Sequence, residues 1–408
     1  MVAFHFPPFA GSSGVQRALR FVQYLPAFQW QPIVLTVHPR AYECTADDLV
    51  GEIPHDTPVE RAFAVDAARH LSIRRRYLRI TATPDRWTMW RFGAIRSGLR
   101  LIEKWRPDVI WSTYPIATAH TIAARLHRRT GLPWIAEFRD PMAQSDYPTD
   151  PVIWKSFKRI EEDALSSSRF AVFATAAAAE MYTARYPDAA DRVRVIENGF
   201  DQAAFEAVDA SPLRHTPLTS GATTLLHSGV VYPSERDPSH LFEAVANLRR
   251  QGAIDPAHLR LRFRGSGHDA FVRSLAARAG VIEFVELLPS TAYGQALEEM
   301  VRADGLLLLQ AANCDNQIPA KLYEYVRAQR PVLALTSHEG STGRFLRGAG
   351  VDSISPLDSV EAIARLLVRF VEDVRAGRAV TPAQSSIEGR SRRAGAGKLA
   401  ELLTEASR

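Results

Sequence analysis

Residues 305–335 read GLLLLQAANCDNQIPAKLYEYVRAQRPVLAL, and their pattern sets the architecture expected for the chain. Two apolar runs, GLLLLQ and PVLAL, flank a segment with helical spacing, which predicts a strand, a helix and another strand. Pro319 suits the first helical position, because its φ is fixed and its missing N–H is not needed there. Lys321 would then lie near the third position, where its charge faces the positive end of the helix dipole. Either this lysine is solvated, or an anion binds at the helix start.

The same alternation of apolar runs and helical segments extends along most of the chain. Strands are expected at residues 2–6, 32–37, 108–113, 133–138, 170–175, 193–198, 223–229, 259–265, 281–286, 305–310 and 331–335. Helices are expected at about 15–28, 117–129, 155–165 and 240–250. Residues 207–222, rich in Pro, Ser and Thr, lack periodicity and are interpreted as a linker or a loop. This order predicts parallel sheets with helices on both faces.

We therefore expect an α/β fold of two facing Rossmann-like, doubly wound domains, at residues 1–200 and 201–382. The 408 residues, 46% of them hydrophobic, are enough for two full cores. The formal charge of +5 is mild and does not indicate a nucleic-acid partner. The chain has only two cysteines, Cys44 and Cys314, without zinc spacing, so a reducing cytoplasm is the expected location. No signal-peptide pattern or membrane-spanning run is found in the sequence.

Two glycine turns are candidate phosphate-binding loops. In FPPFAGSSGVQR, Gly11 and Gly14 bracket a strand-to-helix turn that either faces an anion or is an ordinary turn. In RGSGHDA, Gly265 and Gly267 fit the dinucleotide pattern G-x-G-x-x-G/A. Glu283 and Glu286 follow this turn at about the sequence separation at which a dinucleotide site has the acidic residue that binds the ribose. A nicotinamide or flavin enzyme is therefore an alternative. However, this turn follows the second strand of its domain, and it equally fits an approach to a nucleotide diphosphate.

A loop arginine, Arg236, precedes the helix expected at 240–250 and is either solvated or directed at a ligand. No Asp-x-Asp triplet occurs, which argues against a diphosphate held by a metal ion. Cys/His clusters, a G-x-S-x-G turn and a P-loop lysine are also absent from the sequence. We therefore expect no metal site and no other cofactor.

Four segments together resemble the retaining glycosyltransferases of family 4, which have the GT-B fold. They are HFPPFAGSSGVQRALRFVQYLP, PDVIWSTYPIATAH with PWIAEFRDPM, RVRVIENGFD, and QIPAKLYEYVRAQRPVLAL. The resemblance covers nearly the whole chain. It implies that the first domain binds the acceptor and the second the nucleotide sugar. It also implies that a helix from about residue 383 to residue 408 returns to the first domain.

The resemblance implies roles for individual residues of the second domain. Glu324 matches the last glutamate of the family's E-x7-E motif, which binds the donor ribose, while Asn316 replaces the first. Lys321 and Arg236 match basic residues that hold the donor diphosphate, and both are therefore the catalytic candidates. Gly265 and Gly267 match a turn that lines the nucleotide pocket. Relatives often have an arginine where this chain has Val230.

The resemblance also implies roles for residues of the first domain. Gly11 matches the loop that closes over the diphosphate. Thr113 lies nearest to the place of a histidine found in some relatives, and His120 follows seven residues later. The candidates on the acceptor side are Thr113, His120, Arg139 and Asp140.

The implied activity is transfer of a sugar, with retention, from a nucleotide sugar to a glycan or a lipid-linked glycan, without a metal. The reaction would release a nucleoside diphosphate. The alternatives are a nucleotide-sugar epimerase of the same fold, a nicotinamide-dependent oxidoreductase, and a non-catalytic sugar-binding relative.

Residues 71–106 combine ten Lys and Arg with two acids, and aromatic residues lie among them: Trp87, Trp90, Phe92 and Trp105. One interpretation is a helix packed on the core with a solvated arginine face. The other is a patch that binds an anionic membrane surface, since arginine and tryptophan favour that interface. The second interpretation predicts a cytoplasmic protein that is peripheral on the cytoplasmic face of the membrane.

Overall fold

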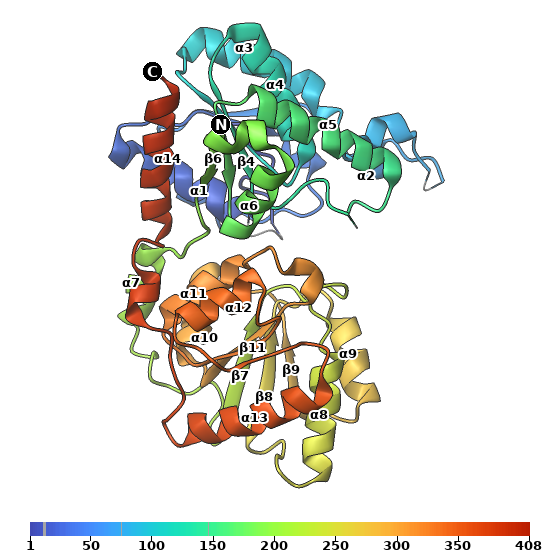
Figure 1. Cartoon of the computed structure of the whole chain (residues 1–408), viewed down its shortest axis with the longest axis vertical. Coiled ribbons are helices and arrows are strands. Elements are labelled where there is room, and N and C mark those ends of the chain that lie inside the picture. Colours follow the sequence, from blue (N-terminus) through green and yellow to red (C-terminus); the bar gives the residue numbers. More distant parts are fainter. Residues whose placement is uncertain (11–13, 75, 146) are drawn as a thin grey trace. The chain divides into compact units, whose positions relative to one another are not determined.

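The computed structural model describes residues 1–10, 14–74, 76–145 and 147–408, which form two compact units (Figure 1). The first unit consists of Met1–Glu197 and Arg392–Arg408, and the second of Asn198–Ser391. The C-terminal helix α14 (Arg392–Ala406) belongs to the first unit. It begins at Arg392 rather than at about residue 383, because residues 383–391 are part of the second unit.

The first unit contains a parallel sheet. Its strands are β1 (Val34–Val37), β2 (Val59–Ala62), β3 (Ile110–Thr113), β4 (Trp134–Phe138), β5 (Phe170–Phe173) and β6 (Val193–Val195). Strands β1 and β2 pair with each other, and β3, β4, β5 and β6 follow one another in that order. Val2 joins the two groups through parallel bridges to Leu35 and Ser112. The strand expected at 2–6 is therefore shorter than predicted, with ladder bonds from Val2 N–H and Ala3 N–H before the chain bends.

Helices cover both faces of this sheet. They are α1 (Gly14–Tyr24), α2 (Ala67–His70), α3 (Trp90–Trp105), α4 (Ala117–Thr130), α5 (Pro151–Ser167), α6 (Ala176–Arg185) and α14. Alternate residues of one strand divide between the faces. Ile135 packs with α1 and α14, whereas Ala136 and Phe138 pack with α3, α4, α5 and α6. Figure 1 shows α1 and α14 on one side of the strands and α3 and α4 on the other.

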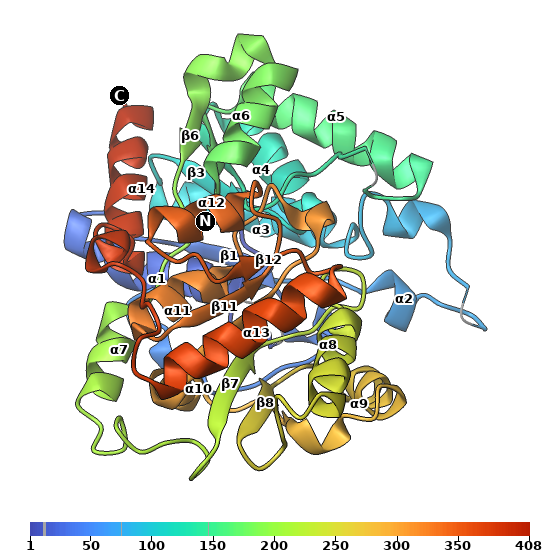
Figure 2. The same ribbon diagram turned by 60° about the horizontal axis from the view of Figure 1, so that its bottom comes forward.

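The second unit has a parallel sheet of the order β12-β11-β10-β7-β8-β9. Its strands are β7 (Thr223–Ser228), β8 (Leu259–Arg264), β9 (Val285–Leu288), β10 (Gly305–Leu309), β11 (Val332–Leu335) and β12 (Ile354–Ser355). Its helices are α7 (Gln202–Asp209), α8 (Ser239–Arg250), α9 (Asp269–Arg278), α10 (Tyr293–Arg302), α11 (Ala320–Ala328), α12 (Ser341–Gly348) and α13 (Val360–Arg375). Figure 2 shows α13 and α8 on one face of this sheet.

Burial on both faces explains the run GLLLL. In β10, Leu306 and Leu308 pack with α10 and α11, while Leu307 and Leu309 pack with α8 and α13. A parallel strand covered on both sides needs apolar residues at every position rather than at alternate ones. The polar residues of this unit's centre are consequently confined to the ends of its strands.

Several expected elements differ in their bounds. Helix α1 ends at Tyr24 and continues as a 3-10 helix at Leu25–Phe28, since Pro26 cannot donate to an α-helical ladder. The strand expected at 281–286 begins only at Val285, after a 3-10 turn at Ile282–Phe284. Helix α7 occupies the start of the expected linker. These shifts move the ends of elements, and β2 and β12 are strands that the sequence pattern did not predict.

The helix start at Pro319 also differs by one position. Pro319 is extended, with ψ of 133°, and is the N-cap of α11, whose first residue is Ala320. Lys321 is therefore the second helical residue rather than the third. No side chain of the described chain caps this helix start by a hydrogen bond. The charge of Lys321 thus lies within the first turn, as predicted.

We expect Gly305→Ala to destabilise the second unit by about 1–3 kcal/mol, the usual cost of overpacking a core. A Cβ at Gly305 would lie 2.8 Å from the Phe370 ring and 2.9 Å from Leu225 Cδ2. The matched control is Gly294→Ala in α10, whose Cβ meets nothing within 4 Å. Chemical denaturation should show a loss only for Gly305→Ala, and equal stability of the two variants would contradict this packing.

Candidate functional site

The second unit places its candidate residues at the switch point of its sheet. Strands β8 and β9 lie on one side of β7, and β10, β11 and β12 lie on the other. The loop after β7 and the loop after β10 therefore leave in opposite directions from neighbouring strands. In open α/β sheets, ligands bind beyond the carboxyl ends of the strands at such a point. Arg236 follows β7, and Lys321 and Glu324 lie on α11, the helix after β10.

Lys321 is held by a histidine that the sequence analysis did not identify. Its Nζ lies 2.9 Å from Nε2 of His227, a fully buried residue of β7. His227 Nδ1 lies 3.1 Å from the carbonyl of Leu307, so Nδ1 carries the hydrogen and Nε2 accepts from Lys321. Burial, followed by the charges of Lys321 and Arg236, keeps the pKa of His227 well below its ordinary value. The imidazole is thus a neutral acceptor for the ammonium.

Among the residues that the structure describes, no carboxylate forms an ion pair with the ammonium of Lys321, which contacts the neutral His227 instead. Burial lowers its pKa well below the ordinary value, the charge of Arg236 lowers it further, and Glu324 opposes the shift. Gly229, with φ of +102°, lies directly beside it, because a Cβ there would be 3.3 Å from Nζ. The site therefore holds a desolvated cation next to bare backbone. Such an arrangement favours a bound anion.

Arg236 lies in the same loop after β7. Its Nη1 donates to the carbonyl of Val230 at 2.7 Å, and its guanidinium lies 5.0 Å from the centre of the Tyr232 ring. The loop is fixed to the end of β10, since Ala311 N–H donates to Glu235 O at 2.7 Å. Arg236 and Lys321 thus occupy one electropositive region, as the effect of the Arg236 charge on the pKa of Lys321 also indicates.

Glu324 is oriented by a tyrosine. Tyr293 Oη, at the start of α10, donates to Glu324 Oε1 at 2.8 Å, and Glu324 is 8% exposed. Asn316 precedes α11 and is exposed. Another tyrosine of α11, Tyr325, accepts from Ser228 N–H at 2.9 Å and so ties this helix to the end of β7. The two contacts fix α11 against the start of α10 and the end of β7.

The RGSGHDA turn follows β8, beside β7. Gly265 and Gly267 both have positive φ, of +64° and +66°, which explains the requirement for glycine. A Cβ at Gly267 would lie 3.5 Å from Val230 Cγ1, so this turn borders the loop that carries Arg236. Glu286 pairs with Arg262 at 2.7 Å, and Glu283 pairs with Arg249. The two acids that a dinucleotide site would use are therefore engaged elsewhere.

A buried polar network lies at the carboxyl edge of the first unit's sheet. Thr113 Oγ1 donates to Glu137 Oε2 at 2.7 Å, and Arg17 Nε donates to Glu137 Oε1 at 2.9 Å. Glu137 is completely buried, and Arg17 also donates to the carbonyls of Ile196 and Glu197. This network fixes Thr113 and connects α1 to the end of β4. Neither Arg17 nor Glu137 was singled out from the sequence.

Arg139 and Asp140 follow β4 at the same edge. A Cβ on Gly14 would lie only 2.0 Å from Arg139 Nη1, so the guanidinium packs against the start of α1. Burial, followed by the charge of Arg139, lowers the pKa of His5 to about 3. Burial raises the pKa of Asp140, while Arg139 opposes this shift. Gly11 lies outside the described residues.

His120 is remote from any surface. It is completely buried, its Nδ1 lies 2.8 Å from Ser112 Oγ, and its ring packs 4.8 Å from that of Phe138. Burial lowers its pKa to about 3. In this position His120 is a neutral residue of the core, and we assign it no contact with an acceptor.

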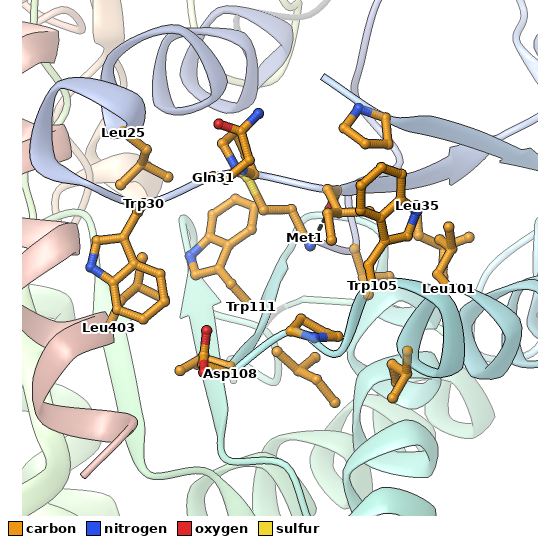
Figure 3. Close-up of a pocket in the computed structure, with 18 of the residues that line it drawn as sticks. Met1, Leu25, Trp30, Gln31, Leu35, Leu101, Trp105, Asp108, Trp111 and Leu403 are labelled. Carbon is orange, nitrogen blue, oxygen red and sulfur yellow. Dashed lines mark hydrogen bonds between the residues drawn. The ribbon is translucent and has the colours of Figure 1, made fainter. Parts of the chain in front are cut away.

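A cavity of about 760 Å³ lies at the opposite, amino edge of the first unit's sheet (Figure 3). Trp30, Trp105 and Trp111 line it, and the Met1 ammonium donates to Ile33 O at 2.7 Å beside it. None of the candidate residues belongs to it. Ligands of such sheets bind at the carboxyl edge, so this cavity is not the candidate site.

The segment 71–106 separates into two parts. Within α3, Trp90 is completely buried and cannot contact a membrane, and Ile95 packs on the core. Phe92 and Trp105, also on α3, are 58% and 46% exposed. The loop before α3 exposes Ile73, Leu78 and Ile80 further, by 79%, 73% and 75%. Arg74 and Arg76 lie in the same loop, Arg79 pairs with Asp150, and Arg75 lies outside the described residues. No helix of the described chain is both long and apolar enough to cross a bilayer.

Residues 13–199 match the family model described as the glycosyl transferase 4-like domain. The first unit therefore contains a glycosyl transferase 4-like domain. The match covers nearly all of the first unit's continuous part and includes Arg17, Thr113, Glu137 and Arg139. Among curated proteins, no relative matches the sequence.

Solved structures of GT-B glycosyltransferases and of an epimerase share the fold of this chain over almost its full length. The HepE protein of Anabaena, solved with UDP, is 14% identical with a TM-score of 0.68 and covers 97% of this chain and 98% of its own. WaaG, a glycosyltransferase involved in lipopolysaccharide biosynthesis, is 12% identical with a TM-score of 0.63, covering 99% and 98%. The UDP-GlcNAc 2-epimerase of Neisseria meningitidis, bound to UDP-GlcNAc, is 11% identical with a TM-score of 0.58, covering 99% and 98%.

Lys321 should give the stability of the ligand-free chain a characteristic pH dependence. The unfolded chain keeps the lysine proton up to about pH 10.4. At pH values between the lowered pKa of Lys321 in the folded chain and about 10.4, the unfolded chain therefore binds more protons than the folded chain. The contribution of Lys321 to the free energy of unfolding consequently rises with pH in this window. We expect the free energy of unfolding, relative to Lys321→Met, to increase with pH in this window. A difference that falls as the pH rises would contradict the assignment.

Proposed function

We propose that this chain transfers a sugar from a nucleoside-diphosphate donor to a glycan or lipid-linked glycan, with retention of configuration. The observation that carries the proposal is the convergence of Lys321 and Arg236 at the switch point of the second unit. Both cations lie beyond the carboxyl ends of β7 and β10, beside the uncapped start of α11. A diphosphate bound there would supply an anion for the buried Lys321.

Each donor-side residue has a distinct role in this proposal. Lys321 and Arg236 stabilise the negative charge that develops on the leaving diphosphate, and the dipole of α11 adds to them. Glu324, oriented by Tyr293, binds the ribose hydroxyls. Gly265 and Gly267 let the backbone approach the nucleotide, and Asn316 contacts a sugar hydroxyl. Attack from the same face then gives retention, with a leaving phosphate oxygen accepting the proton of the acceptor hydroxyl.

The proposed chemistry uses no metal ion. The sequence has no Asp-x-Asp triplet. In the described part of the chain, no group of three His, Cys, Asp or Glu side chains is arranged to hold one. Protein cations and a helix N-terminus can stabilise a leaving diphosphate instead.

The acceptor side of the proposal lies in the first unit, at Thr113, Arg139 and Asp140. We further propose that the loop Leu71–Ile80 binds an anionic membrane surface at the cytoplasmic face. Its apolar side chains Ile73, Leu78 and Ile80 are largely exposed, and arginines lie among them. Apolar insertion together with cationic attraction is the usual basis of peripheral binding. A lipid-linked acceptor would be reached from such a surface.

The first prediction from this proposed function tests the donor site. Lys321→Ala and Glu324→Ala should each lower kcat/KM roughly tenfold to a hundredfold, because a charge-assisted hydrogen bond contributes about 1.5–3 kcal/mol. Arg236→Ala should lower kcat more than Lys321→Ala does. Hydrolysis or transfer is measured with UDP-, GDP- and dTDP-sugars. Arg365→Ala, on the exposed side of α13, is the control, and native kinetics in all three site variants would refute the donor site.

The second prediction tests metal independence. Turnover in excess EDTA should equal turnover in buffer with magnesium or manganese, since the leaving charge is stabilised by Lys321 and Arg236. The assay is run with the donor sugar that gives the fastest turnover. Loss of activity in EDTA that a divalent metal restores would disprove this part of the proposal.

The third prediction tests the membrane loop. The native chain should co-sediment with anionic vesicles at low salt and dissociate as salt rises, because screening acts over about 8 Å at 0.15 M. Arg74→Gln, Arg76→Gln and Arg79→Gln together should weaken binding, as should Ile73→Ser with Leu78→Ser. Arg365→Gln with Arg369→Gln removes charge from α13 as a control. Equal binding to neutral and anionic vesicles would count against the loop.

A further inference from the structure

Arg139 is a partly buried guanidinium for which the described chain provides little compensation. It follows β4 directly, at the carboxyl edge of the first unit's sheet. Its Nε is buried, and no described residue forms a hydrogen bond with that atom. Burial lowers the pKa of Arg139, the charges of Asp140 and Glu137 oppose the shift, and that of Arg17 adds to it. A buried donor without a partner costs about 1–3 kcal/mol, more for a charged group, and a bound ligand can supply the missing partner.

The surroundings of Arg139 are electropositive. The guanidinium lies against Gly14, the first residue of α1, where any Cβ would be 2.0 Å from Nη1 and 2.6 Å from His5 Nδ1. The N-terminal end of α1 adds a positive partial charge. Glu137 cannot neutralise Arg139 fully, because Arg17 and Thr113 already occupy both of its carboxylate oxygens. Burial also raises the pKa of Asp140, which disfavours its charged form.

We propose that Arg139, at the start of α1, binds an oxyanion of a substrate, a phosphate or a carboxylate. The inference rests on the proposed transfer and adds a substrate class to it. Arginine suits this role, since its planar fork of donors matches both kinds of oxyanion and keeps its charge. Two sources have this chemistry: an acidic group carried by the acceptor, and the diphosphate of the donor.

The test compares the native full-length chain with Arg139→Met. The probe is inorganic phosphate, titrated at constant ionic strength in a thermal-shift assay. Arg139→Met should weaken phosphate binding roughly tenfold to a hundredfold, the effect of one charge-assisted pair. It should also raise the Tm of the ligand-free chain, because an uncompensated buried charge is removed. Arg139→Lys should restore part of the binding.

The matched control is Arg128→Gln, an exposed arginine paired with Asp163 in the same unit. It should leave phosphate binding unchanged. If Arg139→Met binds phosphate as tightly as the native chain, the inference is wrong. It is also wrong if Arg139→Met lowers the ligand-free Tm and leaves the phosphate affinity of its folded fraction intact, since Arg139 then only supports the fold.

Binding of UDP, GDP and dTDP distinguishes the two sources. Unchanged nucleotide affinity in Arg139→Met, with a raised KM for the acceptor, assigns the oxyanion to the acceptor. Weakened nucleotide affinity assigns it to the donor diphosphate. The oxyanion site and the transferase can also fail separately. If phosphate binding depends on Arg139 but nucleotide sugars are not turned over, only the transferase proposal is refuted. If turnover depends on Lys321 but Arg139→Met binds phosphate like the native chain, only the oxyanion site is refuted.

Discussion

The structure depends on parallel strands that are buried on both faces. Leu306 to Leu309 alternate between two helical layers, so β10 has no face where a polar side chain would be solvated. The backbone N–H and C=O groups of such strands form hydrogen bonds with the neighbouring strands. Functional polar side chains are therefore expected at the ends of the strands. Each unit follows this rule. His227 of β7 and Glu137 of β4 are buried polar residues that lie near the carboxyl ends of their strands, and each contacts a cationic side chain.

Desolvated cations at the ends of strands affect both the stability of the ligand-free chain and its binding of anions. The pKa values of Lys321 and Arg139 are both lowered, and burial is the largest cause in each case. The charges of nearby carboxylates oppose these shifts but do not reverse them. Their retention costs stability in the ligand-free chain, as is usual for binding sites. A bound anion would remove that cost, so substrate binding and stabilisation are expected to occur together.

The fold alone does not distinguish the possible activities. The structure is similar to transferases and to a UDP-GlcNAc 2-epimerase at comparable coverage. Function therefore has to be argued from sites. The family model of the first unit favours transfer, and the ion pairs of Glu283 and Glu286 leave the RGSGHDA turn without the acids of a dinucleotide site.

The sequence by itself determined the alternation of most strands and helices, because apolar periodicity reports which residues face a core, but it did not reveal the short strands β2 and β12. It also placed Lys321 and Glu324 in the first turns of one helix and required glycine at 265 and 267, since these are local properties of the backbone. Only the tertiary structure brought His227 to Lys321, Tyr293 to Glu324 and Arg17 to Glu137. These partners are 94, 31 and 120 residues apart, and no local pattern encodes such a distance. The sequence also did not show that Trp90 is buried while Ile73 and Leu78 are exposed. In a segment that mixes cationic and aromatic residues, burial depends on what packs against each side chain in the folded chain.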